Sequence, residues 1–280
     1  MALDVMLIVL FSALLHAGWN ALVRSAADKL LSTLMVVWGA GALALLLLPA
    51  LPLPAAQSWP QLAVSTLLHV AYFTLVAWSY RHAGLSFAYP VMRGTAPALT
   101  AIAAAVALGE LPTPGGLAGI VLICGGVLLL AGAAWRTGLV RSNSLGFALG
   151  NAVVIATYTL VDGQGVRLSG HAVSYTAWLF LLTAVLMLGG ALALRGAIVL
   201  RQARALWRTA LLGGAGTLGA YTLVLWAMAQ APIALVAALR ETSIVFAALI
   251  GVLFLKESLS RLRVVSIALV CAGAAAIKLF

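Results

Sequence analysis

The sequence predicts an all-α integral membrane protein, with ten transmembrane helices arranged as two inverted five-helix repeats. Hydrophobic residues make up 64% of the 280 residues and charged residues only 8%, whereas a soluble domain is nearer half apolar and a quarter charged. Proline, glycine and charged residues divide the chain into ten apolar runs, each long enough to cross a bilayer. Residues 92–126 also resemble residues 239–273, which indicates an internal duplication.

The ten predicted helices account for nearly the whole chain. The connections between them are short, so neighbouring helices must run antiparallel and no loop can hold a soluble domain. The runs do not alternate apolar and polar residues, as the strands of a membrane β-barrel would. In order, the expected spans are 5–23, 31–51, 61–80, 85–108, 115–134, 145–163, 172–194, 209–229, 233–255 and 262–280. The residues that interrupt the chain between successive runs are Arg24, Pro52, Arg81, Glu110, Arg136, Arg167, Arg195, Pro232 and Lys256.

The net charge of +10 is a topology signal, because no water-facing domain is available to carry a nucleic-acid-binding patch. Of the sixteen Lys and Arg residues, twelve lie in loops after odd-numbered spans, and only Arg167 and Lys278 lie on the opposite side. The positive-inside rule therefore places the odd-numbered loops in the cytoplasm and both termini outside. Asp4 stands where a signal peptide would carry basic residues, so we expect the first helix to be retained.

The internal repeat has an offset of 147 residues. Its informative matches pair residue types that are scarce in this chain, namely Arg93 with Arg240, Glu110 with Glu257 and Cys124 with Cys271. Because the unit has five helices, an odd number, the second copy must cross the membrane in the opposite sense. Secondary transporters use such inverted halves and hold substrate where the halves meet. We expect halves at residues 1–137 and 138–280, and a duplicated scaffold without a transport role is the alternative.

Three short motifs carry a family resemblance. Gly109-Glu110-Leu111 closes the fourth span, Lys256-Glu257-Ser258-Leu259 closes the ninth, and His16-Ala17-Gly18-Trp19-Asn20 lies in the first. With its two five-helix halves, the chain resembles the drug/metabolite transporter superfamily, in particular its ten-helix EamA-like branch. It departs from that pattern at Lys256, where glycine is usual, and at Thr157-Tyr158-Thr159, where Trp-Asn is expected. The resemblance implies a multi-pass carrier of the bacterial inner membrane, expected to be an exporter of small metabolites such as amino acids, which uses no ATP.

Three ionisable residues lie well inside predicted spans, where a charge costs roughly 2.5–3.5 kcal/mol on translocon scales. These are Arg93 in the fourth span and Arg240 and Glu241 in the ninth. A guanidinium offers a bidentate fork, so either arginine is suited to an anionic group of a ligand. The alternative is structural: the arginines bond helix carbonyls or Glu241 and lock the halves together. Adjacent side chains on a helix point apart, so the expected partner of Glu241 is Arg93.

Polar side chains form stripes on two further spans, which must face a cavity or a neighbouring helix because lipid offers them no partners. In the first span, His16, Trp19 and Asn20 share a face. In the sixth, Asn151, Tyr158 and Asp162 do so. A histidine titrates near neutral pH, so His16 is a candidate proton relay, as is Glu241; an ordinary interhelical hydrogen bond is the alternative for the histidine.

Tyrosines are the expected wall of a pocket, because a buried phenol needs a hydrogen-bond partner. Ser65, His69 and Tyr72 fall on one face of the third span, and Thr217 and Tyr221 share a face of the eighth. The predicted substrate-binding residues are Arg93, Arg240, Glu241, His16, Trp19, Asn20, Tyr72, Tyr89, Tyr158 and Tyr221.

Other residues suggest structural roles. Glu110 and Glu257 end their helices, where a negative charge opposes the helix dipole, so we expect them to pair with backbone N–H groups or bases as locks. Small-residue grooves for helix packing are expected at Gly115 with Gly119 and at Gly146 with Gly150. The prolines Pro90 and Pro97 should kink the fourth span beside Arg93.

An integral-membrane enzyme and a non-transporting structural membrane protein are the competing classes. An enzyme needs clustered acids, a metal set or an activated nucleophile, whereas the acids inside these spans are isolated and the four histidines are dispersed. Cys124 and Cys271 lie in separate apolar runs, which favours neither a disulfide scaffold nor a metal site. We expect no cofactor other than a coupling proton. The expected partners are a small-molecule substrate and the lipid bilayer, and the protein is expected to be a monomer or a homodimer.

Overall fold

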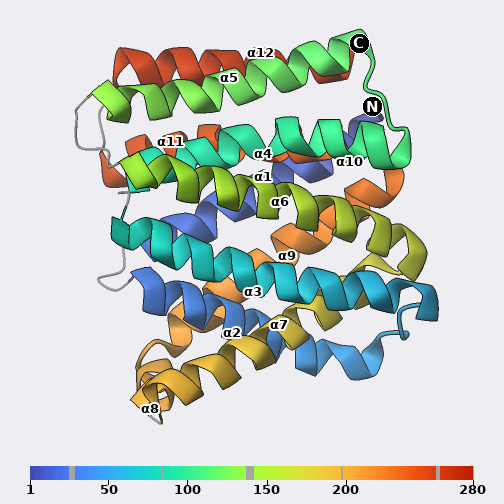
Figure 1. Ribbon diagram of the computed structural model, residues 1–280, viewed down its shortest axis with the longest axis vertical. Helices are drawn as coiled ribbons and strands as arrows, with labels where there is room; N and C mark the ends of the chain where they lie inside the picture. The colour runs from blue at the N-terminus through green and yellow to red at the C-terminus, as the bar shows by residue number, and fades with distance from the viewer. Residues whose placement is uncertain (25–28, 83–84, 137–141, 197, 257–258, 280) are drawn as a thin grey trace.

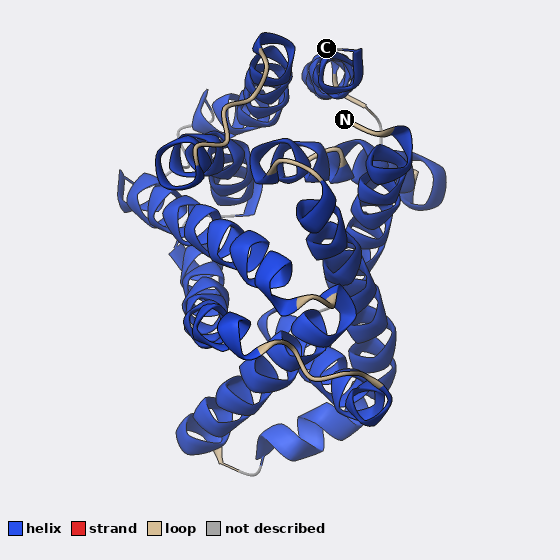
Figure 2. Ribbon diagram, turned by 90° about the vertical axis from the view of Figure 1, so that its right-hand side faces the viewer, coloured by secondary structure: helices blue, strands red, loops and turns tan. Residues whose placement is uncertain are grey.

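The computed structural model describes residues 1–24, 29–82, 85–136, 142–196, 198–256 and 259–279, and in these ranges it contains helices and connecting loops but no strand (Figure 2). The crossing helices are α1 (Leu3–Arg24), α2 (Lys29–Leu47), α3 (Trp59–His82), α4 (Leu85–Leu108), α5 (Pro114–Arg136), α6 (Ser142–Ser169), α7 (Ala172–Arg195), α9 (Trp207–Gln230), the pair α10 (Ile233–Arg240) and α11 (Ser243–Leu255), and α12 (Arg261–Leu279). Short helices η1 (Leu48–Ala50), η2 (Ala56–Ser58) and α8 (Ile198–Ala205) lie in the connections. The predicted all-α fold of ten crossings is confirmed, and the ninth crossing is divided into two helices.

Nine segments of the described chain are long and apolar enough to cross a membrane, and α10 with α11 makes one of them. The remaining crossing, α3, carries buried polar side chains, among them Ser65, Thr66 and His69. Large apolar side chains cover the outer surface, as Val106 (84% exposed) and Leu194 (87% exposed) illustrate. Such a surface suits lipid rather than water, and the protein is a multi-pass membrane protein.

Both termini lie on the same side of the molecule, as an even number of crossings requires (Figure 1). The Lys278 Nζ atom donates a hydrogen bond of 3.3 Å to the Met1 carbonyl oxygen, which joins the end of α12 to the start of α1. The short helix α8, with the exposed Arg201 and Arg204, lies on the opposite side. This arrangement is compatible with the predicted orientation, in which the arginine-rich side is cytoplasmic.

The contact between α5 and α12 shows the inverted symmetry directly, because these helices are the last of each repeat and lie side by side (Figure 1). A Cβ atom built on Gly119 would lie 2.7 Å from the Gly273 carbonyl oxygen, and one built on Gly126 would lie 3.0 Å from the Ser266 carbonyl oxygen. The repeat offset of 147 residues relates Gly119 to Ser266 and Gly126 to Gly273. Exchanging the repeats therefore exchanges one contact for the other, as a two-fold relation requires.

The small-residue prediction holds for Gly119 but is wrong for Gly146 and Gly150, where a built Cβ would meet nothing within 4 Å. The buried face of α6 carries Ala148 and Ala152 instead, each 0% exposed. In a membrane helix the lipid-facing and protein-facing sides are both apolar, so the sequence pattern identifies small residues without identifying the packed face.

Substitution of Gly119 tests the close contact of α5 with α12. The added methyl group of Gly119→Ala would lie 2.5 Å from the Ile277 Cγ1 atom, and overpacking of this kind costs about 1–3 kcal/mol. We expect the apparent Tm of the purified protein in detergent to fall by several degrees. Gly125→Ala is the matched control on the same helix, because nothing lies within 4 Å of a Cβ there; equal Tm values for the two variants would contradict the contact.

Candidate functional site

The ninth crossing is interrupted at Glu241 and Thr242, between α10 and α11. The Glu241 and Thr242 N–H groups donate to the carbonyl oxygens three residues earlier, those of Ala238 (2.9 Å) and Leu239 (3.0 Å), as in a tighter helix. The Thr242 Oγ1 atom also donates to the Leu239 carbonyl oxygen, at 2.7 Å. A hydroxyl that takes a backbone acceptor competes with regular helix formation, so Thr242 favours the interruption.

The repeat-related helix α4 remains one helix over Leu85–Leu108, with Pro90 and Pro97 inside it. The two repeats therefore differ in backbone conformation at corresponding positions. The ninth crossing is interrupted although it has no proline between Ile233 and Leu255.

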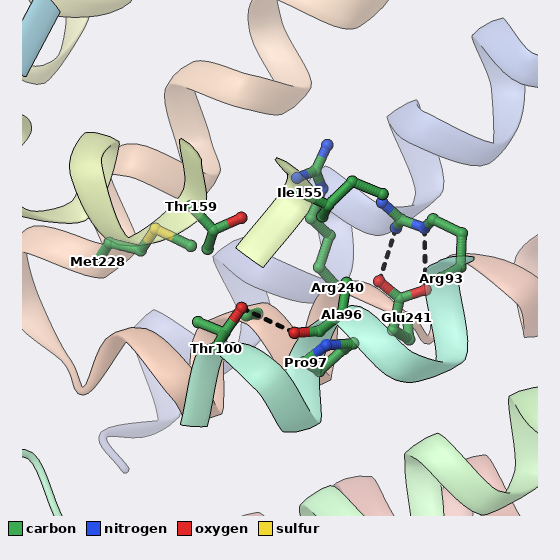
Figure 3. Close-up of a pocket in the computed structure, with 10 residues that line it drawn as sticks. Arg93, Ala96, Pro97, Thr100, Ile155, Thr159, Met228, Arg240 and Glu241 are labelled. Carbon is green, nitrogen blue, oxygen red and sulfur yellow. Dashed lines mark hydrogen bonds and ion pairs between the residues drawn. The ribbon is translucent and has the colours of Figure 1, made fainter. Parts of the chain in front are cut away.

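A buried ion pair joins the repeats at this interruption (Figure 3). The Arg93 Nε atom of α4 donates to Glu241 Oε2 at 3.0 Å, and Arg93 Nη2 lies 2.8 Å from Glu241 Oε1. The two side chains are 3% and 6% exposed. The pairing expected between these residues is present, and it satisfies both buried charges.

Arg240 has a different environment from its repeat counterpart Arg93. No described carboxylate forms an ion pair with it, and its guanidinium carbon lies 5.2 Å from the centre of the Tyr221 ring. Figure 3 shows its side chain directed away from the Arg93–Glu241 pair. An aromatic face attracts a cation without neutralising it, so Arg240 has no ion-pair partner among the described residues.

Both arginines line a cavity of about 10 Å³, which is room for about one water molecule. It is bounded by α4, α6, α9 and α10, and therefore by both repeats (Figure 3). The residues that line it are Arg93, Ala96, Pro97, Thr100, Ile155, Thr159, Met228, Ala237, Arg240 and Glu241. Two threonine hydroxyls and three charged groups make this a polar site inside an otherwise apolar protein.

A second polar cluster adjoins the cavity through Tyr221. Asp162, 0% exposed on α6, accepts hydrogen bonds from Tyr175 of α7 (3.0 Å) and Tyr221 of α9 (2.5 Å). His69 of α3 stacks on Tyr158 with ring centres 4.4 Å apart, and its Nδ1 atom lies 3.2 Å from Ser65 Oγ.

The remaining predicted site residues lie at different distances from the arginines. Both arginines interact electrostatically with His16 and with Tyr89. Trp19 packs edge-on against His16, with ring centres 5.2 Å apart, and its buried Nε1 atom has no hydrogen-bond partner among the described residues. Tyr72 contacts Tyr158, at 5.6 Å between ring centres.

Asn20 is the exception among the predicted site residues. Its Nδ2 atom donates to the His16 carbonyl oxygen at 2.7 Å, within α1 itself. This hydrogen bond connects Asn20 to neither arginine of the site.

Glu110 acts as the predicted lock on the side of the termini. It pairs with Arg167 at the end of α6, and its Oε2 atom accepts from the Ile233 N–H group at 2.9 Å. Arg167 also donates to the carbonyl oxygens of Met228 (2.9 Å) and Ala231 (3.0 Å). The ends of α4, α6 and α9 and the start of α10 are thereby tied together. The repeat counterpart, Glu257, lies outside the described residues.

Comparison with known proteins identifies the family. The family model for EamA-like transporters matches residues 4–132 and, a second time, residues 143–279. The chain belongs to the EamA-like transporter family. The predicted resemblance is thus confirmed, and the protein is a membrane transporter of the drug/metabolite transporter superfamily. The predicted boundary between the halves, after residue 137, lies outside the described residues.

One protein of known crystal structure superposes on this EamA-like transporter with a TM-score of 0.76, covering 100% of this chain and 98% of that chain. The two are 21% identical in sequence, so the likeness shows the fold alone. None of the curated proteins matches the chain.

Sequence reasoning missed several residues of this EamA-like transporter's polar interior. Asp162 was expected on an inward face, but not as the acceptor for two tyrosines, and Tyr175 was not expected at all. A lone acid inside a span is a usable signal. The tyrosine that meets it comes from another helix, which no local pattern reveals. Within the described residues, no three His, Cys, Asp or Glu side chains come together as a metal site would require.

The Arg93–Glu241 pair can be tested by a double-mutant cycle on thermal unfolding in detergent. Arg93→Gln or Glu241→Gln alone leaves one buried charge uncompensated, which costs about 3–5 kcal/mol. The double variant removes both charges, so we expect it to be more stable than either single variant. If the two losses simply add, the residues do not act as a pair.

Proposed function

We propose that this protein is a secondary-active or facilitative transporter of the bacterial inner membrane that carries small anionic or zwitterionic metabolites, such as amino acids, by alternating access. The family supports transport in general. The single observation that supports the substrate class is Arg240, a cation on the cavity wall with which no described carboxylate forms an ion pair. The resemblance to exporters is the basis for expecting export, and an exporting role belongs to this proposal.

A carboxylate suits this site because Arg240 presents a fork of N–H donors that can bind its two oxygens together. Arg93 is less available, since its Nε atom donates to Glu241 and its Nη2 atom lies 2.8 Å from the same carboxylate. Thr159 lines the same cavity and can supply a further hydrogen bond to a polar substrate, whereas the Thr100 hydroxyl already donates to the Ala96 carbonyl oxygen at 2.9 Å. We therefore assign anion binding to Arg240, and positioning of the ninth crossing to the Arg93–Glu241 pair.

The volume of the cavity supports a closed conformation. A space of about 10 Å³ holds about one water molecule, so a metabolite requires the repeats to move apart. On the side of the termini, Glu110 and Arg167 tie both repeats together. We propose that the Glu110–Arg167 contact closes one entrance and that rocking of the repeats breaks it.

Substitution of Arg240 tests the assignment by counterflow in proteoliposomes, with radiolabelled amino acids and organic acids as probes. Hydrogen bonds to charged groups contribute about 1.5–3 kcal/mol each, so we expect Arg240→Gln to raise the half-saturating concentration by about 10- to 100-fold. Arg204→Gln, on the exposed face of α8, is the matched control and should transport normally. Normal transport by folded Arg240→Gln protein would exclude a ligand role for this residue.

A substrate variant tests which group Arg240 binds. Replacing the carboxylate of a transported probe by a carboxamide removes its charge and leaves its shape nearly unchanged. We expect the wild type to take up the carboxamide with a half-saturating concentration about 10- to 100-fold higher, the loss expected for a charged hydrogen bond. Arg240→Gln should no longer distinguish the two probes. Undiminished discrimination in this variant would place the carboxylate elsewhere.

A further inference from the structure

The short helix α8 (Ile198–Ala205) joins α7 to α9 on the side of the molecule opposite the termini (Figure 1). Its 8 residues, at a rise of about 1.5 Å each, extend only about 12 Å, which is too short to cross a bilayer. Because α7 ends at Arg195 and α9 begins at Trp207, α8 lies where two antiparallel crossings reach the membrane surface. Its side chains therefore meet the boundary between lipid and water.

One face of α8 packs on the protein and the opposite face is exposed. Val199 is 2% exposed, and Ala203, one turn later, is half-buried. Arg201 and Arg204 are both exposed, and residues three apart on a helix are neighbours on its surface. The outer face of α8 therefore presents two adjacent guanidinium groups away from the protein interior.

The positive charge of this region is not balanced by nearby acids. Residues 195–208 contain four arginines, whereas the chain has no Asp or Glu from residue 163 to residue 240. The four arginines are Arg195, Arg201, Arg204 and Arg208. No described carboxylate forms an ion pair with any of them. Their charges are therefore available to an anion from outside the protein.

Exposed apolar side chains flank these arginines. Ile198 (55%), Leu200 (52%) and Trp207 (56%) are each about half exposed, and the guanidinium carbon of Arg208 lies 5.4 Å from the centre of the Trp207 ring. Arginines together with exposed Trp and Leu are typical of helices that lie in the membrane interface. A phosphate ion from water would leave the apolar side chains without a partner, whereas a phospholipid supplies both a phosphate and acyl chains.

The corresponding connection of the first repeat has none of these features. It joins α2 to α3 through η1 and η2, and residues 48–58 contain no Lys, Arg, Asp or Glu. The second and third helices of a repeat can therefore be joined without charged residues. Membrane topology favours basic residues on the predicted cytoplasmic side, where the lipids are anionic, but it does not require that they share one exposed helical face beside a tryptophan.

We propose that α8 is a binding site for an anionic phospholipid of the leaflet on the arginine-rich side. Arg201 and Arg204 hold the headgroup phosphate, whose oxygen atoms suit guanidinium forks. The acyl chains lie against Ile198, Leu200 and Trp207. This site is on the outer surface and does not depend on which substrate is transported. Because α8 packs on α7 and α9, a bound lipid holds the ends of these crossings together and stabilises the folded protein.

Quenching of Trp207 fluorescence by brominated lipids measures which lipid occupies the site. The protein is reconstituted in phosphatidylcholine vesicles that contain increasing fractions of brominated phosphatidylglycerol or brominated phosphatidylcholine. Each protein is compared with its own Trp207→Phe version, so that the difference reports on Trp207 alone. A basic residue strengthens attraction to an anionic membrane by about fivefold, so for two arginines we expect a preference for phosphatidylglycerol of about 10- to 30-fold.

Double variants test which arginines produce this preference. Arg201→Gln with Arg204→Gln should abolish it, whereas Arg201→Lys with Arg204→Lys keeps both charges and should retain most of it. The matched control is Lys256→Gln with Arg261→Gln, which removes the same number of exposed charges near the start of α12, at the other end of the long axis in Figure 1. This control should keep the preference of the wild type.

Equal quenching of the wild type by the two brominated lipids would overturn the proposal and leave the arginines to a partner in water. A preference that persists in the folded double glutamine variant would also overturn it. In detergent, added phosphatidylglycerol should raise the apparent Tm and inorganic phosphate should not; an equal rise with inorganic phosphate would assign the site to a free anion instead of a lipid. The wild-type measurements decide the question even if the glutamine variant folds poorly.

Discussion

The buried ion pair of Arg93 with Glu241 ties the two repeats together at the interrupted ninth crossing. A charge in a low-dielectric interior must be compensated where it lies, and a single carboxylate is available for two arginines. Because both Glu241 oxygens are directed to Arg93, Arg240 turns to the face of Tyr221. This one pairing therefore separates two residues that the repeat makes equivalent: Arg93 has a carboxylate partner, whereas Arg240 forms no ion pair with a described residue.

Symmetry is kept where the protein only packs and is lost where charges lie. The contact of α5 with α12 repeats under exchange of the halves, through Gly119 and Gly126 and their counterparts. Helix α4 is continuous, whereas its counterpart is divided into α10 and α11. Two copies of one scaffold can exchange conformations during transport.

The sequence predicts the crossings well because hydropathy measures transfer into lipid directly. The expected runs coincide with the observed crossings to within four residues, except that α6 continues to Ser169, six residues beyond the expected end. It also predicts the Arg93–Glu241 pair, since a buried charge demands a partner and few are available. It fails where several helices meet. The interruption after Arg240 involves neither proline nor glycine, and the Asp162 cluster needs Tyr175 and Tyr221 from two other helices. The sequence also does not show which face of a membrane helix packs against its neighbours, because the lipid-facing and protein-facing sides are both apolar.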